Sequence, residues 1–170
     1  MRRNPAQRGN AMIEMTLVGI PLMFMLLCIF EISRAMWVYN TMAHAVKEGV
    51  RFAVVHGQTC VSNPPSITNS CAKTVADVAN RIKYMGIGID GSITTVRFTS
   101  DAGAFDCLLN DCVNDVSLWP PAGGNGVGHW VGIKISAPFP TALAMLWPGV
   151  RQVSFAPFHV GASAGERIRF

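Results

Sequence analysis

A twenty-residue apolar run near the N-terminus constrains this chain more than any other feature. Residues 11–30 read AMIEMTLVGIPLMFMLLCIF; sixteen of them are apolar, and Glu14 is the only charged residue. Twenty helical residues span about 30 Å, which is the thickness of the hydrocarbon core of a bilayer. The run therefore predicts a transmembrane helix, with a core helix buried in a soluble protein as the alternative.

The charges before the run predict its orientation. Arg2, Arg3 and Arg8 precede it, and Asp and Glu are absent there. Because basic residues stay on the cytoplasmic side, we expect a cytoplasmic N-terminus and a C-terminal part outside. Of the 14 Lys and Arg residues, 11 remain elsewhere against 10 Asp and Glu. This near-neutral remainder argues against a nucleic-acid-binding face, which needs clustered basic residues.

The helix is expected to continue past the membrane and to end near Val55. Apolar residues recur at steps of three and four from Ile32 to Ala53, so this part is amphipathic. Residues 58–69 read as a loop. A second helix is predicted to be capped by Asn69 or Ser70 and to end near Tyr84. Its expected buried stripe is Val75, Val78, Ala79 and Ile82.

The remainder of the chain predicts a small sheet. Strand composition and alternation mark 92–100, 129–137 and part of 150–163, with a long loop over 101–128 and a short apolar piece within 138–148. The expected fold class is α+β, a long N-terminal helix packed on an antiparallel sheet of three to four strands. The expected divisions are a basic leader (1–9), the helix (10–57, crossing the membrane at about 11–30) and an α+β domain (58–170).

The cysteines favour disulfides. Cys28 lies in the apolar run, where a lone thiol behaves as a small hydrophobe. Cys60, Cys71, Cys107 and Cys112 lie on the outer, oxidising side of the predicted membrane. Local pairing, Cys60 with Cys71 and Cys107 with Cys112, is the first choice among three connectivities. A zinc site is the rival, although its usual spacing is C-x2–4-C; the spacing of the neighbouring aspartates does not match a calcium loop.

The sequence offers no catalytic pattern. The four histidines are scattered without a nearby acidic residue; they are His44, His56, His129 and His159. Motifs of serine hydrolases, zinc peptidases and phosphate-binding loops are absent from the sequence. We therefore predict a protein that is not an enzyme and uses no cofactor, metal or small-molecule substrate. A membrane-tethered hydrolase remains an alternative without candidate residues.

A glycine and a glutamate at the start of the run resemble a known processing signal. Gly9 ends the basic leader, and Glu14 is the fifth residue after it. This arrangement resembles the class III prepilin signal of type IV pilins and pseudopilins. The resemblance implies cleavage by a prepilin peptidase between Gly9 and Asn10. It also implies that Glu14 pairs with a freed N-terminal amine during assembly, which suits the physics, since a buried carboxylate needs a partner.

A longer stretch, residues 8–57, resembles the TadE-like family of minor pseudopilins in tight-adherence (Flp) pilus systems. The shared marks are Arg8-Gly9, Pro21, the E-x-x-R of Glu31 and Arg34, and K-E-G-V-R-F-A over 47–53. Met15 and Asn10 depart from the residues usual at their positions.

This second resemblance implies a pilin-like, single-pass protein of the bacterial inner membrane with a periplasmic domain. The implied partners are the membrane, a prepilin peptidase, other pilin or pseudopilin subunits and the assembly platform. The alternative is an uncleaved, signal-anchored periplasmic binding or scaffold protein.

Overall fold

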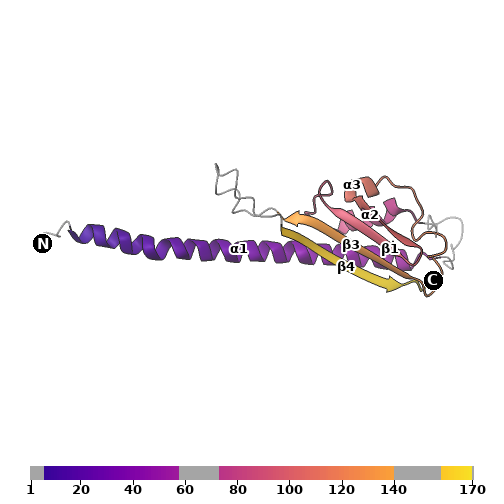
Figure 1. The fold of residues 1–170 in the computed structure, drawn as a ribbon, viewed down its shortest axis with the longest axis horizontal. Helices are drawn as coiled ribbons and strands as arrows, with labels where there is room; N and C mark the ends of the chain where they lie inside the picture. Colours follow the sequence, from indigo (N-terminus) through magenta and orange to yellow (C-terminus); the bar gives the residue numbers. More distant parts are fainter. Residues whose placement is uncertain (1–5, 58–72, 140–157, 170) are drawn as a thin grey trace. The chain divides into compact units, whose positions relative to one another are not determined.

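A computed structural model describes residues 6–57, 73–139 and 158–169 (Figure 1). The chain divides into two compact units. Unit 1 is Met1–Met36 and unit 2 is Trp37–Phe170. The described elements are α1 (Ala6–Val54), α2 (Val75–Met85), β1 (Thr95–Ser100), β2 (Gly103–Leu108), α3 (Leu109–Cys112), β3 (Trp130–Phe139) and β4 (Phe158–Arg167).

The long N-terminal helix is confirmed as α1, which ends at Val54, one residue before the predicted position. Hydroxyl side chains on α1 donate hydrogen bonds to backbone carbonyl groups of the same helix. Thr16 donates to the carbonyl oxygens of Met12 (3.1 Å) and Ile13 (2.9 Å), and Ser33 donates to that of Ile29 (2.8 Å). Such bonds remove the need for outside partners, so these residues are tolerated on an apolar helix.

The predicted α+β fold is confirmed by a four-stranded antiparallel sheet with the order β2-β1-β3-β4. Strands β1 and β3 pair through Phe98 and Ile133, and β3 and β4 pair through Ile133 and Ala164. Alternation places Val96, Phe98, Val131, Ile133 and Ile135 on one buried face.

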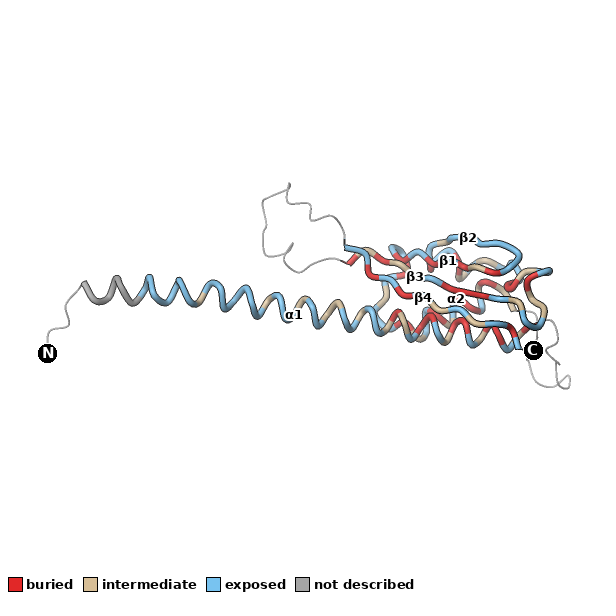
Figure 2. Tube along the Cα trace, turned by 60° about the horizontal axis from the view of Figure 1, so that its bottom comes forward, coloured by how far each residue is buried: buried red, intermediate tan, exposed pale blue. Residues whose placement is uncertain are grey.

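The part of α1 that belongs to unit 2 packs onto that buried face (Figure 2). Gly49 marks the closest approach: a Cβ atom there would lie 2.7 Å from Cγ1 of Ile82 on α2 and 3.3 Å from Cδ1 of Ile133 on β3. Only a residue without a side chain lets the helix come so close to both elements. The core of unit 2 therefore forms where α1, α2 and the sheet meet.

The second helix has its predicted buried stripe but a different cap. Val75, Val78, Ala79 and Ile82 are buried, as expected. The cap is Thr74, and not Asn69 or Ser70, which lie outside the described residues. The Thr74 hydroxyl accepts from the backbone N–H of Asp77 (3.2 Å), and the Asp77 carboxylate accepts from that of Thr74 (2.9 Å). This reciprocal capping box explains why α2 begins at Val75.

The predicted loop over 101–128 is partly wrong, because it contains β2 and α3. Residues of β2 are almost all exposed, so this edge strand lacks the alternation that marks a half-buried strand. The other strands are shifted: β1 begins at Thr95, β3 extends to Phe139 and β4 runs from Phe158 to Arg167. The apolar piece predicted within 138–148 lies outside the described residues from 140 onward.

Candidate functional site

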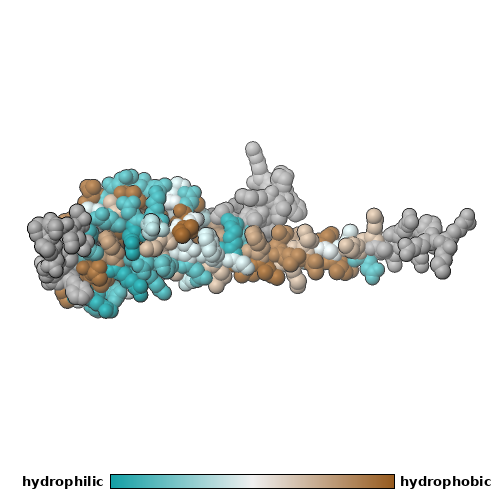
Figure 3. All heavy atoms as spheres, turned by 180° about the vertical axis from the view of Figure 1, so that it is seen from behind, coloured by the Kyte–Doolittle hydropathy of each residue, from teal (hydrophilic) through white to brown (hydrophobic). Residues whose placement is uncertain are grey.

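The most unusual surface of the described chain is the apolar side of unit 1. Met12, Leu17 and Phe24 are 76%, 74% and 51% exposed, and none of the most apolar window of the helix is buried (Figure 3). Soluble proteins rarely leave a continuous apolar surface uncovered. The described residues do not bury this stretch, which has the length and composition of a membrane span.

Glu14 is the charged exception on this surface. Its side chain is exposed, and among the described residues its carboxylate has no hydrogen-bond or ion-pair partner. Gly9 and Asn10 lie in the first turns of α1, so their backbone is helical. Five helical residues rise about 7.5 Å, which places Glu14 less than two turns after Gly9. Within the described ranges, Glu14 is thus an acid without a partner near the start of an apolar helix.

The E-x-x-R pair lies further along α1. Arg34 Nη1 and Glu31 Oε2 are 3.7 Å apart, a spacing expected for side chains three residues apart on a helix.

The K-E-G-V-R-F-A stretch has a packing role in unit 2. Gly49, Val50 and Ala53 are buried. Glu48 lies 3.1 Å from Arg51 on the same helix and 3.7 Å from Arg81 on α2. Buried small residues and one bridging carboxylate therefore hold α1 against α2, which gives this motif a physical reason.

The predicted pairing of Cys107 with Cys112 is confirmed. The two residues form a disulfide with Cα atoms 5.7 Å apart, linking β2 to α3. Because both thiols are consumed, a zinc site that uses them is ruled out. Cys28 is a free, exposed thiol on α1. Cys60 and Cys71 lie outside the described residues. Within the described ranges, no group of three or more potential metal ligands occurs.

One histidine has an acidic partner that sequence spacing does not reveal. His129 Nδ1 lies 3.1 Å from Asp101 Oδ2, which also accepts a 2.9 Å hydrogen bond from the Trp130 backbone N–H. That backbone bond and the His129 contact hold the pKa of Asp101 below its ordinary value. The partners are 28 residues apart, so only folding joins them. The pair ties the turn after β1 to the start of β3.

The other histidines form no such pair among the described residues. His44 and His159 are exposed, and the His56 ring stacks at a tilt on Phe52 with centroids 4.6 Å apart.

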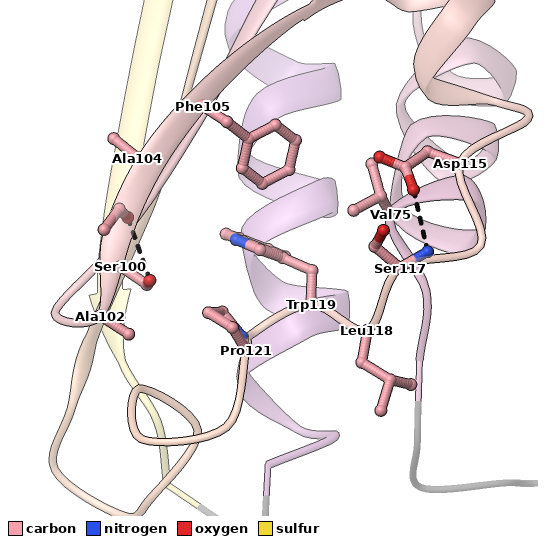
Figure 4. A pocket seen from close by; sticks show the side chains of 11 residues that line it. Val75, Ser100, Ala102, Ala104, Phe105, Asp115, Ser117, Leu118, Trp119 and Pro121 are labelled. Carbon is pink, nitrogen blue, oxygen red and sulfur yellow. Dashed lines mark hydrogen bonds between the residues drawn. The ribbon is translucent and has the colours of Figure 1, made fainter.

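A pocket of about 340 Å³ lies between the β1–β2 turn and the segment after α3 (Figure 4). Its polar groups serve local turns: the Ser100 hydroxyl donates to the carbonyl of Gly103 (3.1 Å), and Asp115 accepts from the Ser117 backbone (2.9 Å). Hydrogen bonds from the Ser117 hydroxyl and backbone N–H lower the pKa of Asp115, which keeps it ionised. The lining contains neither histidine nor cysteine.

An open groove of about 740 Å³ lies at another place on unit 2. It is lined by Trp37, Asn40, Thr41 and His44 of α1 and by Tyr84, Met85 and Ile87 at the end of α2. We call it the Trp37 groove. Its lining is mostly apolar and aromatic.

An uncovered apolar N-terminal helix whose continuation packs on a small antiparallel sheet is the architecture expected of a pilin-like protein. The comparison with protein families agrees: the model described as TadE-like protein matches residues 9–51. No curated protein and no solved structure matches the chain. The TadE-like resemblance is therefore confirmed over residues 9–51, which lie within α1. The family is not known to be enzymatic.

Proposed function

We propose that this protein is a minor pseudopilin that functions in assembly of a tight-adherence pilus. It is inserted into the bacterial inner membrane with its N-terminus in the cytoplasm, and unit 2 functions in the periplasm. A prepilin peptidase removes residues 1–9, and α1 then packs against the helices of other subunits. The observation that carries the proposal is the uncovered apolar helix with Glu14 unpartnered near its start.

The chemistry of Glu14 supports an assembly role. An isolated carboxylate within a membrane costs about 2.5–3.5 kcal/mol on insertion scales, so it needs a compensating charge. Cleavage after Gly9 creates such a charge, because it frees the amine of Asn10. An amine of one subunit beside the Glu14 carboxylate of its neighbour satisfies both groups and sets the axial register of the helices.

The position of Gly9 also suits cleavage. A peptidase needs its scissile bond in an extended form, and glycine in a helix is less stable than alanine by about 1 kcal/mol. Gly9 lies in the first turns of α1, where helices fray most easily. Local opening of this turn therefore exposes the bond before Asn10 at little cost.

Cleavage is tested by co-expressing the full chain with a prepilin peptidase and measuring the intact mass of the membrane-extracted protein. We expect a mature chain that begins at Asn10. Gly9→Val should block processing, while Gly19→Val, a matched change on the same helix, should leave it intact. Retention of Arg2 in the presence of an active peptidase would favour the uncleaved, signal-anchored scaffold.

Assembly is tested with Glu14→Leu in a strain that assembles the pilus. This variant should insert into the membrane and be processed, but its incorporation with other pilin subunits should be lost. Glu31→Gln is the matched control, since it also removes one carboxylate from α1. Normal assembly by Glu14→Leu would contradict the register mechanism.

A further inference from the structure

The Trp37 groove joins three large side chains that unit 2 leaves in the open. Trp37, Tyr84 and Ile87 are 54%, 77% and 73% exposed, although each lines the same groove. Tryptophan and tyrosine combine an apolar ring with a polar N–H or O–H group, which is why they concentrate at membrane–water interfaces. The composition of the groove thus suits a medium that is partly apolar and partly wet.

The groove is formed by a specific turn and is not a chance gap between side chains. Gly88 has a φ of +82°, and a Cβ atom there would lie 3.0 Å from Cη2 of Trp37. Both the positive φ and the close indole ring require glycine at this position. The turn after α2 therefore lies against Trp37 and holds Ile87 beside it.

Covalent connection keeps the groove near the apolar run. Trp37 lies seven positions after Phe30, the last residue of the run. These seven steps span about 10 Å as helix and at most about 25 Å as extended chain. Ile32 and Met36 in this interval are 64% and 55% exposed. Headgroup layers add several ångströms to each side of the roughly 30 Å hydrocarbon core.

We propose that the Trp37 groove rests in the outer interfacial layer of the bilayer that α1 crosses, where lipid headgroups and upper acyl chains fill it. This inference rests on the proposed function, because it needs α1 to span a membrane. Tyr84 and Ile87 contact the lipid, while Asn40 and His44, which also line the groove, face the headgroups. Unit 2 thereby gains a second attachment to the membrane besides α1 itself.

The test uses the purified full chain in nanodiscs of phosphatidylethanolamine and phosphatidylglycerol. The photoreactive residue benzoylphenylalanine replaces Tyr84 or Ile87, and intact mass after illumination identifies the adducts. Both positions are highly exposed, so the replacement does not disturb the core. We expect lipid adducts at both positions.

Val116 is the matched control, because it is 81% exposed and apolar. Its neighbours Asp115 and Ser117 accept backbone hydrogen bonds from Ala76 and Val75, at the opposite end of α2 from Ile87. The 11-residue helix between them is about 16 Å long. The same replacement at Val116 should give few lipid adducts.

Replacement of Leu22 separates the two proposals. Lipid adducts at Leu22 without adducts at Tyr84 and Ile87 would overturn the groove assignment and leave the membrane span intact. Adducts of Ile87 to a second copy of the chain, or equal lipid adducts at Ile87 and Val116, would also overturn it. If Leu22 itself gives no lipid adduct, the proposed membrane function fails as well.

Discussion

The two stretches of α1 show how one helix serves two environments. In unit 1 the apolar side chains are uncovered, as at Phe24, which is 51% exposed. In unit 2 similar side chains are covered by the sheet and α2, so Met42 is 1% exposed and Val46 is fully buried. Both stretches are helical, but only the second is covered by other elements of its own unit. In the proposed function, the bilayer and the helices of other subunits cover the first stretch.

Removing an aromatic side chain should lower the free energy of unfolding when the side chain lies in the core of unit 2, but not when it lies on unit 1. Trp119 is buried beside Phe98, with ring centroids 5.0 Å apart, so Trp119→Ala should lower the free energy of unfolding of unit 2 by about 4 kcal/mol. Phe24→Ala should leave it unchanged. Urea unfolding of the full chain in detergent, followed by near-ultraviolet circular dichroism, measures both. Equal losses of unfolding free energy in the two variants would contradict this difference between the units.

Substitutions of two glycines on α1 should likewise differ in their effect on the stability of unit 2. Gly49→Leu forces a side chain against Ile82 and should destabilise unit 2 by about 3 kcal/mol. Gly19→Leu is the control, since nothing lies within 4 Å of a Cβ atom at that position. The same urea titration distinguishes them. A stable Gly49→Leu variant would mean that α1 does not approach α2 as closely as described.

Replacing cysteines should give a smaller difference in the stability of unit 2 between disulfide and free-thiol positions. The disulfide between Cys107 and Cys112 closes a loop of sequence separation 5, so the double change Cys107→Ser and Cys112→Ser should cost about 2 kcal/mol. Cys28→Ser, which removes the free thiol of α1, should leave the unfolding midpoint of unit 2 in place. A midpoint that is insensitive to the double change would show that β2 and α3 are held by other contacts.

The smallest expected effect depends on pH. The pKa of Asp101 is lowered in the folded chain by the Trp130 N–H and by His129. Its stabilising contribution is therefore present above the unfolded-state pKa of about 3.9 and is lost as the pH falls through the folded value. Asp101→Asn should slightly lower the urea midpoint at pH 7, and the difference from wild type should vanish in acid.

Asp111→Asn is the control for this measurement, because the Asp111 side chain is exposed and has no hydrogen-bond partner among the described residues. A pH-independent effect of Asp101→Asn would contradict the ionic origin of the contribution.

Local patterns predicted the elements whose burial is periodic. The stripe of α2 and the alternation of β3 both follow from the need to cover one face, and each appears in the fold with small shifts in its ends. Strand β2 escaped prediction because an exposed edge strand has no such period. The cap at Thr74 does have a signal in the sequence, because Asp77 follows it at the spacing of a capping box.

The sequence by itself determined the apolar helix, the basic residues before it and the TadE-like resemblance, because these depend on residues adjacent along the chain. Only the tertiary structure decided that Asp101 meets His129, that Gly49 brings α1 against Ile82, and that Trp37 shares a groove with Tyr84 and Ile87. These contacts join residues far apart in the chain, and spacing along a sequence carries no information about which distant surfaces pack together.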